Sequence, residues 1–255
     1  MKELDPTYAF HLCLYALSLE CILFFAVVSR SQDPYAHEGI ARAFSLIFLF
    51  QSAAAFSCVL ALQSFEGMFS EVVATASAFF IIATLFVCIP GAALVAIPEM
   101  RYRIWKTALT LVNIVALFFS AMIVGPKIGT TLDLPYVTDA LQSRLVGAMF
   151  GALIIVLIAS LIRLIRPPES LKGRSGAAVL ASGTIFILLA GAVWAYLADA
   201  CQFKDNVLDE ACALPQSFDH NALFSLVTII ANGFVAEGVL RLMAAGTGQD
   251  GYIRI

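Results

Sequence analysis

The sequence predicts an all-α, polytopic membrane protein, a bundle of seven transmembrane helices. Hydrophobic residues make up 61% of the 255 residues and charged residues 13%, against roughly 45–50% and 25% in soluble domains. The mean hydropathy is +0.91. Because apolar stretches leave no room for a soluble domain, we expect one transmembrane domain over residues 1–255. The formal charge of −3 and the lack of a basic run argue against a nucleic-acid partner.

Seven apolar stretches are each long enough to cross ~30 Å of hydrocarbon at ~1.5 Å per residue. They fall at about residues 8–28, 40–62, 72–97, 104–125, 143–165, 175–199 and 218–243. The first follows an acidic leader, Met1-Lys2-Glu3-Leu4-Asp5-Pro6, with no small-residue cleavage site after it. We therefore expect it to remain as a span and not to be removed as a signal peptide.

The orientation follows from the basic residues, because Lys and Arg near spans stay on the cytoplasmic side. Eleven of the 15 fall on one side of the predicted topology and four on the other. The larger group is Arg30, Arg42, Arg101, Arg103, Lys106, Arg163, Arg166, Lys172, Arg174, Arg241 and Arg254; the smaller is Lys2, Lys127, Arg144 and Lys204. The N-terminus is therefore expected outside and the C-terminus in the cytoplasm.

Two cysteines, Cys201 and Cys212, lie in the predicted outer loop between the sixth and seventh spans. An oxidising compartment would let them form a disulfide, which constrains so short a loop by roughly 3 kcal/mol at most. The alternative is two free thiols. A disulfide at this position suits a bacterial inner membrane or a eukaryotic secretory membrane.

Polar residues form one stripe on the seventh stretch. Their spacing of four, four, three and four places them on one side of a helix whose other sides are apolar. They are Ser217, Asn221, Ser225, Thr228 and Asn232. A polar stripe on a membrane helix faces other helices and not lipid, so we expect Asn221, Ser225, Thr228 and Asn232 to line a ligand-binding interior.

Glu20 is an acidic residue deep in the first stretch, ~18 Å from an outer start near Tyr8 by helical rise. An unpaired carboxylate at that depth costs several kcal/mol, so the group should be protonated or paired. Asn113 and Asn232 reach similar depths in the fourth and seventh stretches. The three residues therefore form a candidate central ligand site. The alternative is a set of separate interhelical hydrogen bonds, each worth about 0.6 kcal/mol on average.

Two histidines fall near the predicted outer surface, His11 in the first stretch and His220 in the seventh. If these helices close a ring, the two histidines and a carboxylate such as Asp219 or Asp199 would suit zinc. The remaining histidine, His37, lies in an inner loop, so no site with three histidines can form. The alternative is a solvated acidic surface that binds no metal.

The run Phe218-Asp219-His220-Asn221-Ala222-Leu223-Phe224-Ser225 resembles the start of the seventh helix in bacterial relatives of the alkaline ceramidase and progestin/adipoQ receptor superfamily. In that superfamily a His-Asn pair is followed by an apolar pair and a second histidine. The resemblance implies seven spans around a zinc held by three histidines, and hydrolysis of a lipid amide. His220 matches the first histidine, but Ser225 stands where the second is expected, so the metal-binding set is incomplete.

Three classes of function follow from these features. The first is a non-enzymatic membrane protein, either a subunit of a larger membrane complex or a binder of lipid or another apolar ligand. The second is a ceramidase-like, metal-dependent lipid hydrolase, and the third is a small proton-linked transporter that uses Glu20. The stretch 218–243 contains no Lys, so a retinal Schiff base is excluded. The small residues Gly147 and Gly151 serve internal packing or self-association.

Overall fold

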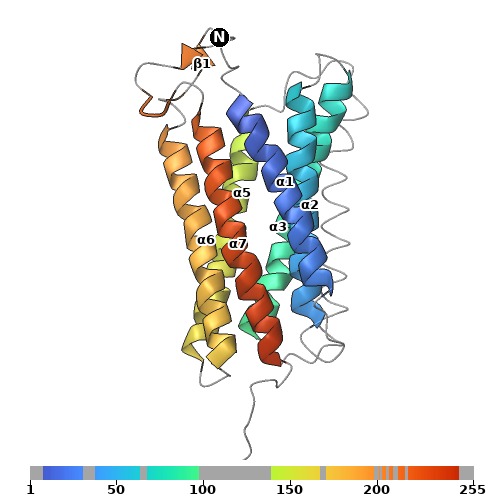
Figure 1. The fold of residues 1–255 in the computed structure, drawn as a ribbon, viewed down its shortest axis with the longest axis vertical. Coiled ribbons are helices and arrows are strands. Elements are labelled where there is room, and N and C mark those ends of the chain that lie inside the picture. Colours follow the sequence, from blue (N-terminus) through green and yellow to red (C-terminus); the bar gives the residue numbers. More distant parts are fainter. Residues whose placement is uncertain are drawn as a thin grey trace, which may run out of the picture.

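The protein, examined as a computed structural model, is a bundle of long helices that run side by side (Figure 1). The structure describes residues 8–30, 38–63, 68–97, 139–166, 171–197, 201, 203–204, 207–208, 212–215 and 218–246. The helices in these ranges are α1 (Tyr8–Arg30), α2 (Glu38–Gln63), α3 (Met68–Ala96), α5 (Asp139–Ile165), α6 (Leu171–Leu197) and α7 (His220–Gly246). The predicted span at 104–125 lies outside the described residues, so a total of seven spans stays a prediction.

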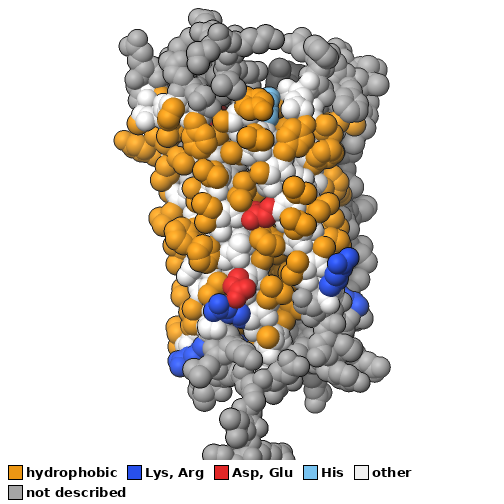
Figure 2. Space-filling view, viewed as in Figure 1, with side chains coloured by type: hydrophobic (Ala, Val, Ile, Leu, Met, Phe, Trp, Pro, Cys, Tyr) orange, Lys and Arg blue, Asp and Glu red, His pale blue; other side chains and the backbone are white. Residues whose placement is uncertain are grey.

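Five helical segments in the described ranges are long and apolar enough to cross a membrane: Tyr8–Arg30, Gly39–Gln63, Val72–Ala96, Gly173–Leu197 and His220–Ala245. Helix α5 adds a shorter apolar segment, Met149–Ile165. Together they indicate a multi-pass membrane protein. Figure 2 shows hydrophobic side chains over most of one face, with Lys and Arg gathered toward one end.

The described helices close a ring. Each helix packs against the next in the order α1, α2, α3, α5, α6 and α7, and α7 packs back against α1. The core between them consists of aliphatic and aromatic side chains such as Phe44, Phe48, Leu180 and Leu242. Because α7 packs against α1, the outer ends of the two helices lie close together, as the metal hypothesis requires. The middle of α1 likewise lies beside the middle of α7.

Helices α6 and α7 make the closest backbone approach, through glycines. A Cβ atom added at Gly238 would lie 2.6 Å from the Leu180 nitrogen, and one at Gly183 would lie 2.9 Å from the Ala231 oxygen. Small residues let membrane helices approach this closely and increase their van der Waals contact. Gly183 thus gives α6 a thin surface toward α7. At Gly151, by contrast, no atom of the described residues lies within 4 Å of an added Cβ.

A short hairpin stands between α6 and α7, at the end of the bundle where α1 and α7 begin (Figure 1). Its strands β1 (Phe203–Lys204) and β2 (Val207–Leu208) pair antiparallel, with Phe203 opposite Leu208. The predicted disulfide joins Cys201 to Cys212 across the hairpin, with 4.7 Å between their Cα atoms. Among the described residues, the fold is therefore helical apart from this covalently closed loop.

All arginines with described side chains lie toward the opposite end of the bundle. They are Arg30, Arg42, Arg163, Arg166, Arg174 and Arg241, which occur where α1, α5 and α7 end and where α2 and α6 begin. The charge asymmetry that predicted the orientation is thus present in three dimensions. We continue to call the arginine end the inner end, and its placement in the cytoplasm stays a prediction.

Candidate ligand site between helices α1 and α7

Glu20 lies close to the midpoint of α1, which runs from Tyr8 to Arg30. By helical rise its Cα is ~18 Å from one end of the helix and ~15 Å from the other. The side chain is half-buried. The carboxyl group is therefore placed where hydrocarbon, and not water, would surround the bundle.

Asn232 of α7 meets this carboxyl group from the neighbouring helix. Its side chain is 3% exposed and lies within interaction distance of the Glu20 carboxyl group. Its amide nitrogen, Nδ2, donates to the Cys21 sulfur at 3.4 Å. Asn232 thus links α7 to the part of α1 that carries Glu20. Asn113 lies outside the residues that the structure describes, so the cluster of Glu20, Asn113 and Asn232 stays a prediction.

One carboxylate oxygen of Glu20 is left without a protein partner. Oε2 is buried and makes no hydrogen bond with any described residue. Leaving a buried polar atom unsatisfied costs about 1–3 kcal/mol, so such atoms are rare in native proteins unless a ligand, an ion or water completes them. Glu20 therefore offers a ligand a hydrogen-bond acceptor at mid-bilayer depth, or a hydrogen-bond donor if its carboxyl group is protonated.

A serine pair fixes α1 from its other side. Ser52 Oγ of α2 donates to the Ser18 carbonyl oxygen at 2.8 Å, and the two hydroxyl oxygens are 3.0 Å apart. Both residues are buried. They were not selected from the sequence, where they are two of several serines in apolar helices. The pair holds α1 against α2 two residues before Glu20, and so limits how that carboxyl group can move.

The predicted polar stripe of α7 does not form one continuous lining. Ser225, Thr228 and Asn232 are all buried, but Thr228 Oγ1 donates to the Phe224 carbonyl of its own helix at 2.8 Å. Asn221 turns toward α6, where its Oδ1 accepts a hydrogen bond from Trp194 Nε1 at 2.9 Å. Asn232 instead turns toward α1. The stripe is thus divided between two helix contacts.

Asp219 serves as the N-cap of α7. Its Oδ1 accepts a hydrogen bond from the Ala222 backbone nitrogen at 2.8 Å, and its Oδ2 accepts one from Asn221 Nδ2 at 2.9 Å. This is the usual role of an Asp just before a helix, where it satisfies an otherwise free N–H group. The N-cap role is thus a sufficient reason for an Asp at position 219, and it does not require a metal ion.

The two outer histidines were predicted to share a metal with Asp219. His220 packs beside the Trp194 ring with centroids 5.9 Å apart, and its Nδ1 is buried without a hydrogen bond to the described residues. His11 lies half-buried on α1 beside Phe10. Within the described ranges, no three His, Cys, Asp or Glu side chains come together as a group that could hold a metal ion. The zinc hypothesis therefore stays a prediction from the resemblance.

The fold and this site indicate a class of protein, a helical multi-pass membrane protein with a polar contact at mid-depth between its first and last described helices. No family model matches the chain, and searches of curated proteins and of solved structures found no significant match. Any more specific function therefore has to be argued from the site itself.

Proposed function

We propose that the chain is a non-enzymatic integral membrane protein that binds an apolar ligand at the interface of α1 and α7. The ligand would carry a hydroxyl or amide group that hydrogen-bonds to Glu20. The observation that carries this proposal is the buried Oε2 atom of Glu20, which has no partner among the described residues at the centre of an apolar bundle.

The neighbouring groups support such a ligand. Asn232 joins α7 to α1 next to Glu20 through its hydrogen bond to Cys21, and the serine pair holds α1 from the opposite side. The site is therefore built before the ligand binds, which lowers the conformational entropy lost on binding. Apolar side chains line the helices above and below Glu20, including Leu17 and Phe24. A mainly apolar molecule with one polar group matches this distribution.

Lipid extraction from the purified protein tests the proposal. A molecule that co-purifies with the wild type at near one-to-one ratio should fall at least tenfold in Glu20→Leu. A hydrogen bond to a charged group is worth about 1.5–3 kcal/mol, and about 1.4 kcal/mol corresponds to tenfold in affinity. Glu20→Gln keeps an acceptor in the same place and should retain most of the ligand. Mass spectrometry of organic extracts provides the measurement.

A matched control is Ser182→Leu, which also replaces an in-membrane polar residue with leucine. Ser182 is exposed on α6 and bonds only within its own helix, to the Ala178 carbonyl at 3.0 Å. This variant should keep the ligand at the wild-type ratio. Identical extracts from wild type, Glu20→Leu and Ser182→Leu would show that Glu20 binds no ligand.

A proton-linked transporter is the second candidate, because the same half-buried carboxyl group lies between two helices at mid-depth. Such a transporter would load a proton on Glu20 together with its substrate. Proton uptake into proteoliposomes that disappears in Glu20→Gln would favour this candidate over simple ligand binding. The ceramidase-like hydrolase remains a hypothesis from the resemblance alone, and near-stoichiometric zinc lost in His220→Ala would support it.

A further inference from the structure

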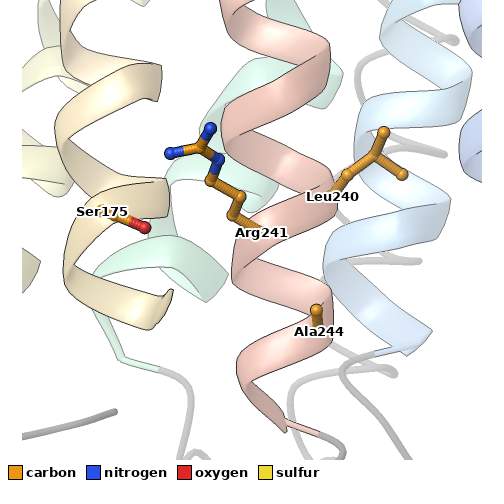
Figure 3. A pocket seen from close by; sticks show the side chains of 4 residues that line it. All are labelled: Ser175, Leu240, Arg241 and Ala244. Carbon is orange, nitrogen blue, oxygen red and sulfur yellow. The ribbon is translucent and has the colours of Figure 1, made fainter. Parts of the chain in front are cut away.

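A groove opens between α6 and α7 near the inner end of the bundle, far from Glu20. It encloses about 430 Å³ and is lined by Ser175, Leu240, Arg241 and Ala244. Figure 3 shows the Arg241 guanidinium extending over the space between the two helices, with Ser175 on the opposite helix. Leu240 and Ala244 make the remainder of the lining apolar. The groove thus combines one cationic group with a hydrocarbon wall.

Arg241 keeps free hydrogen-bond donors at this groove. Its Nε donates to Glu237 Oε1 at 2.7 Å within α7, and the two side chains are 43% and 50% exposed. Its terminal Nη groups make no hydrogen bond within the described part of the chain. Those groups form a planar fork that suits a phosphate or carboxylate oxygen pair. The i,i+4 contact with Glu237 holds the guanidinium in place.

The depth of the groove matches the level of lipid headgroups. Ser175 lies four residues after the start of α6, and Arg241 lies five residues before the end of α7. These intervals correspond to ~6 Å and ~8 Å along the helices. Arg174 is exposed next to Ser175. Basic pockets between membrane helices on the cytoplasmic side recognise anionic headgroups.

The wall of the groove is held by a close backbone contact between α6 and α7 at Gly176. A Cβ added at Gly176 would lie 2.8 Å from the Leu242 nitrogen and 3.0 Å from the Arg241 Cβ. Helix α6 is therefore in contact with the helical turn that carries Arg241. A groove between two backbones held this closely keeps its shape when it is empty.

From these features we propose that the groove binds the headgroup of an anionic phospholipid. The phosphate would accept hydrogen bonds from the Arg241 Nη groups, and the first acyl carbons would lie along Leu240 and Ala244. The free donors of Arg241 favour a headgroup whose only charge is that of its phosphate. A headgroup that carries its own ammonium, as in phosphatidylcholine, would bring a second positive charge close to Arg241. The site therefore favours net negative lipids.

The test uses the full chain in nanodiscs that contain phosphatidylglycerol and phosphatidylcholine in equal amounts. Native mass spectrometry then measures which lipid stays bound. We expect phosphatidylglycerol to be retained in preference to phosphatidylcholine. Arg241→Gln should lower its retention at least tenfold, because the phosphate loses its charge-assisted hydrogen bonds to the guanidinium. The matched control is Arg30→Gln, which removes an exposed arginine from the inner end of α1 and should leave retention unchanged.

A second variant separates the proposal from a folding defect. Glu237→Gln removes the carboxylate that competes with the phosphate for Arg241, so retention of phosphatidylglycerol should rise about twofold or more. Misfolding would lower retention in every variant and cannot produce this opposite change. Equal retention of the two lipids, equal retention in Arg241→Gln and Arg30→Gln, or no increase in Glu237→Gln would each overturn the proposal.

Discussion

Replacing Gly238 with Ala should destabilise the bundle by about 1–3 kcal/mol, the usual effect of overfilling a packed contact. The added Cβ would lie 2.6 Å from the Leu180 nitrogen and 2.9 Å from the Gly176 oxygen. Both neighbours are backbone atoms, so α6 and α7 would have to move apart as whole helices. Thermal unfolding in detergent, followed by tryptophan fluorescence, measures the change.

The matched control for this substitution is Gly233→Ala on the same helix. Nothing lies within 4 Å of a Cβ added at Gly233. An alanine is favoured over glycine inside a helix by roughly 0.5–1 kcal/mol in water, so this variant should be neutral or slightly more stable. Opposite signs for the two variants would establish that the close α6–α7 contact stabilises the bundle. Equal stability would contradict it.

Removing the disulfide between Cys201 and Cys212 should lower stability by up to roughly 3 kcal/mol, because the cross-link closes a short loop in the unfolded chain. The sequence separation is 11 residues. The loop leads directly to Asp219, which caps α7, so its ordering also supports the start of that helix. A reductant should lower the unfolding temperature of the wild type to that of the Cys201→Ser, Cys212→Ser variant.

The control for this experiment is the double variant itself, which has no disulfide to reduce. Its unfolding temperature should be the same with and without reductant. The free cysteines Cys13, Cys21, Cys58 and Cys88 remain in both proteins, so any effect of reductant on them is common to both. A wild type that does not respond to reductant would show that the disulfide does not stabilise the fold.

The positions of the spans could be predicted from the sequence because hydrocarbon demands long apolar stretches. The first span was expected at 8–28, and α1 runs from Tyr8 to Arg30. The start of the sixth was placed at 175, but α6 begins at Leu171 and includes Lys172 and Arg174. Hydropathy identifies only the part of a helix that lies in hydrocarbon. The helix itself continues past that part as long as its backbone hydrogen bonds can form, so its ends can contain charged residues that lie outside the predicted span.

The neighbours of each polar residue could not be predicted in the same way. Helical spacing placed Asn221 and Asn232 on one stripe of α7, yet one contacts Trp194 on α6 and the other contacts Cys21 on α1. Two helices that cross at an angle do not keep the same faces in contact along their length. Spacing within one helix carries no information about that crossing. Equal depth placed Glu20 and Asn232 near each other, but the hydrogen bond that the structure shows for Asn232 goes to Cys21.

Small residues likewise predicted close helix contacts without identifying all of them. Gly183 lies at such a contact, whereas Gly151, which belongs to a small-xxx-small pattern with Gly147, has no described residue within 4 Å of an added Cβ. The closest contacts include Gly176 and Gly238, which the sequence analysis did not select. A glycine pattern shows that a helix can approach a neighbour closely. Which neighbour it meets depends on the arrangement of the whole bundle.

Labelling with an apolar carbodiimide tests the central claim, that Glu20 presents a carboxyl group to an apolar ligand within the bilayer, most directly. Such reagents partition into hydrocarbon and react with a carboxylic acid to give a stable adduct. The account predicts one adduct, located by mass spectrometry on the α1 peptide and absent in Glu20→Gln. Asp219, which caps α7, and Glu237, which pairs with Arg241, should remain unmodified. No adduct on Glu20, or equal modification of all three acids, would contradict the claim.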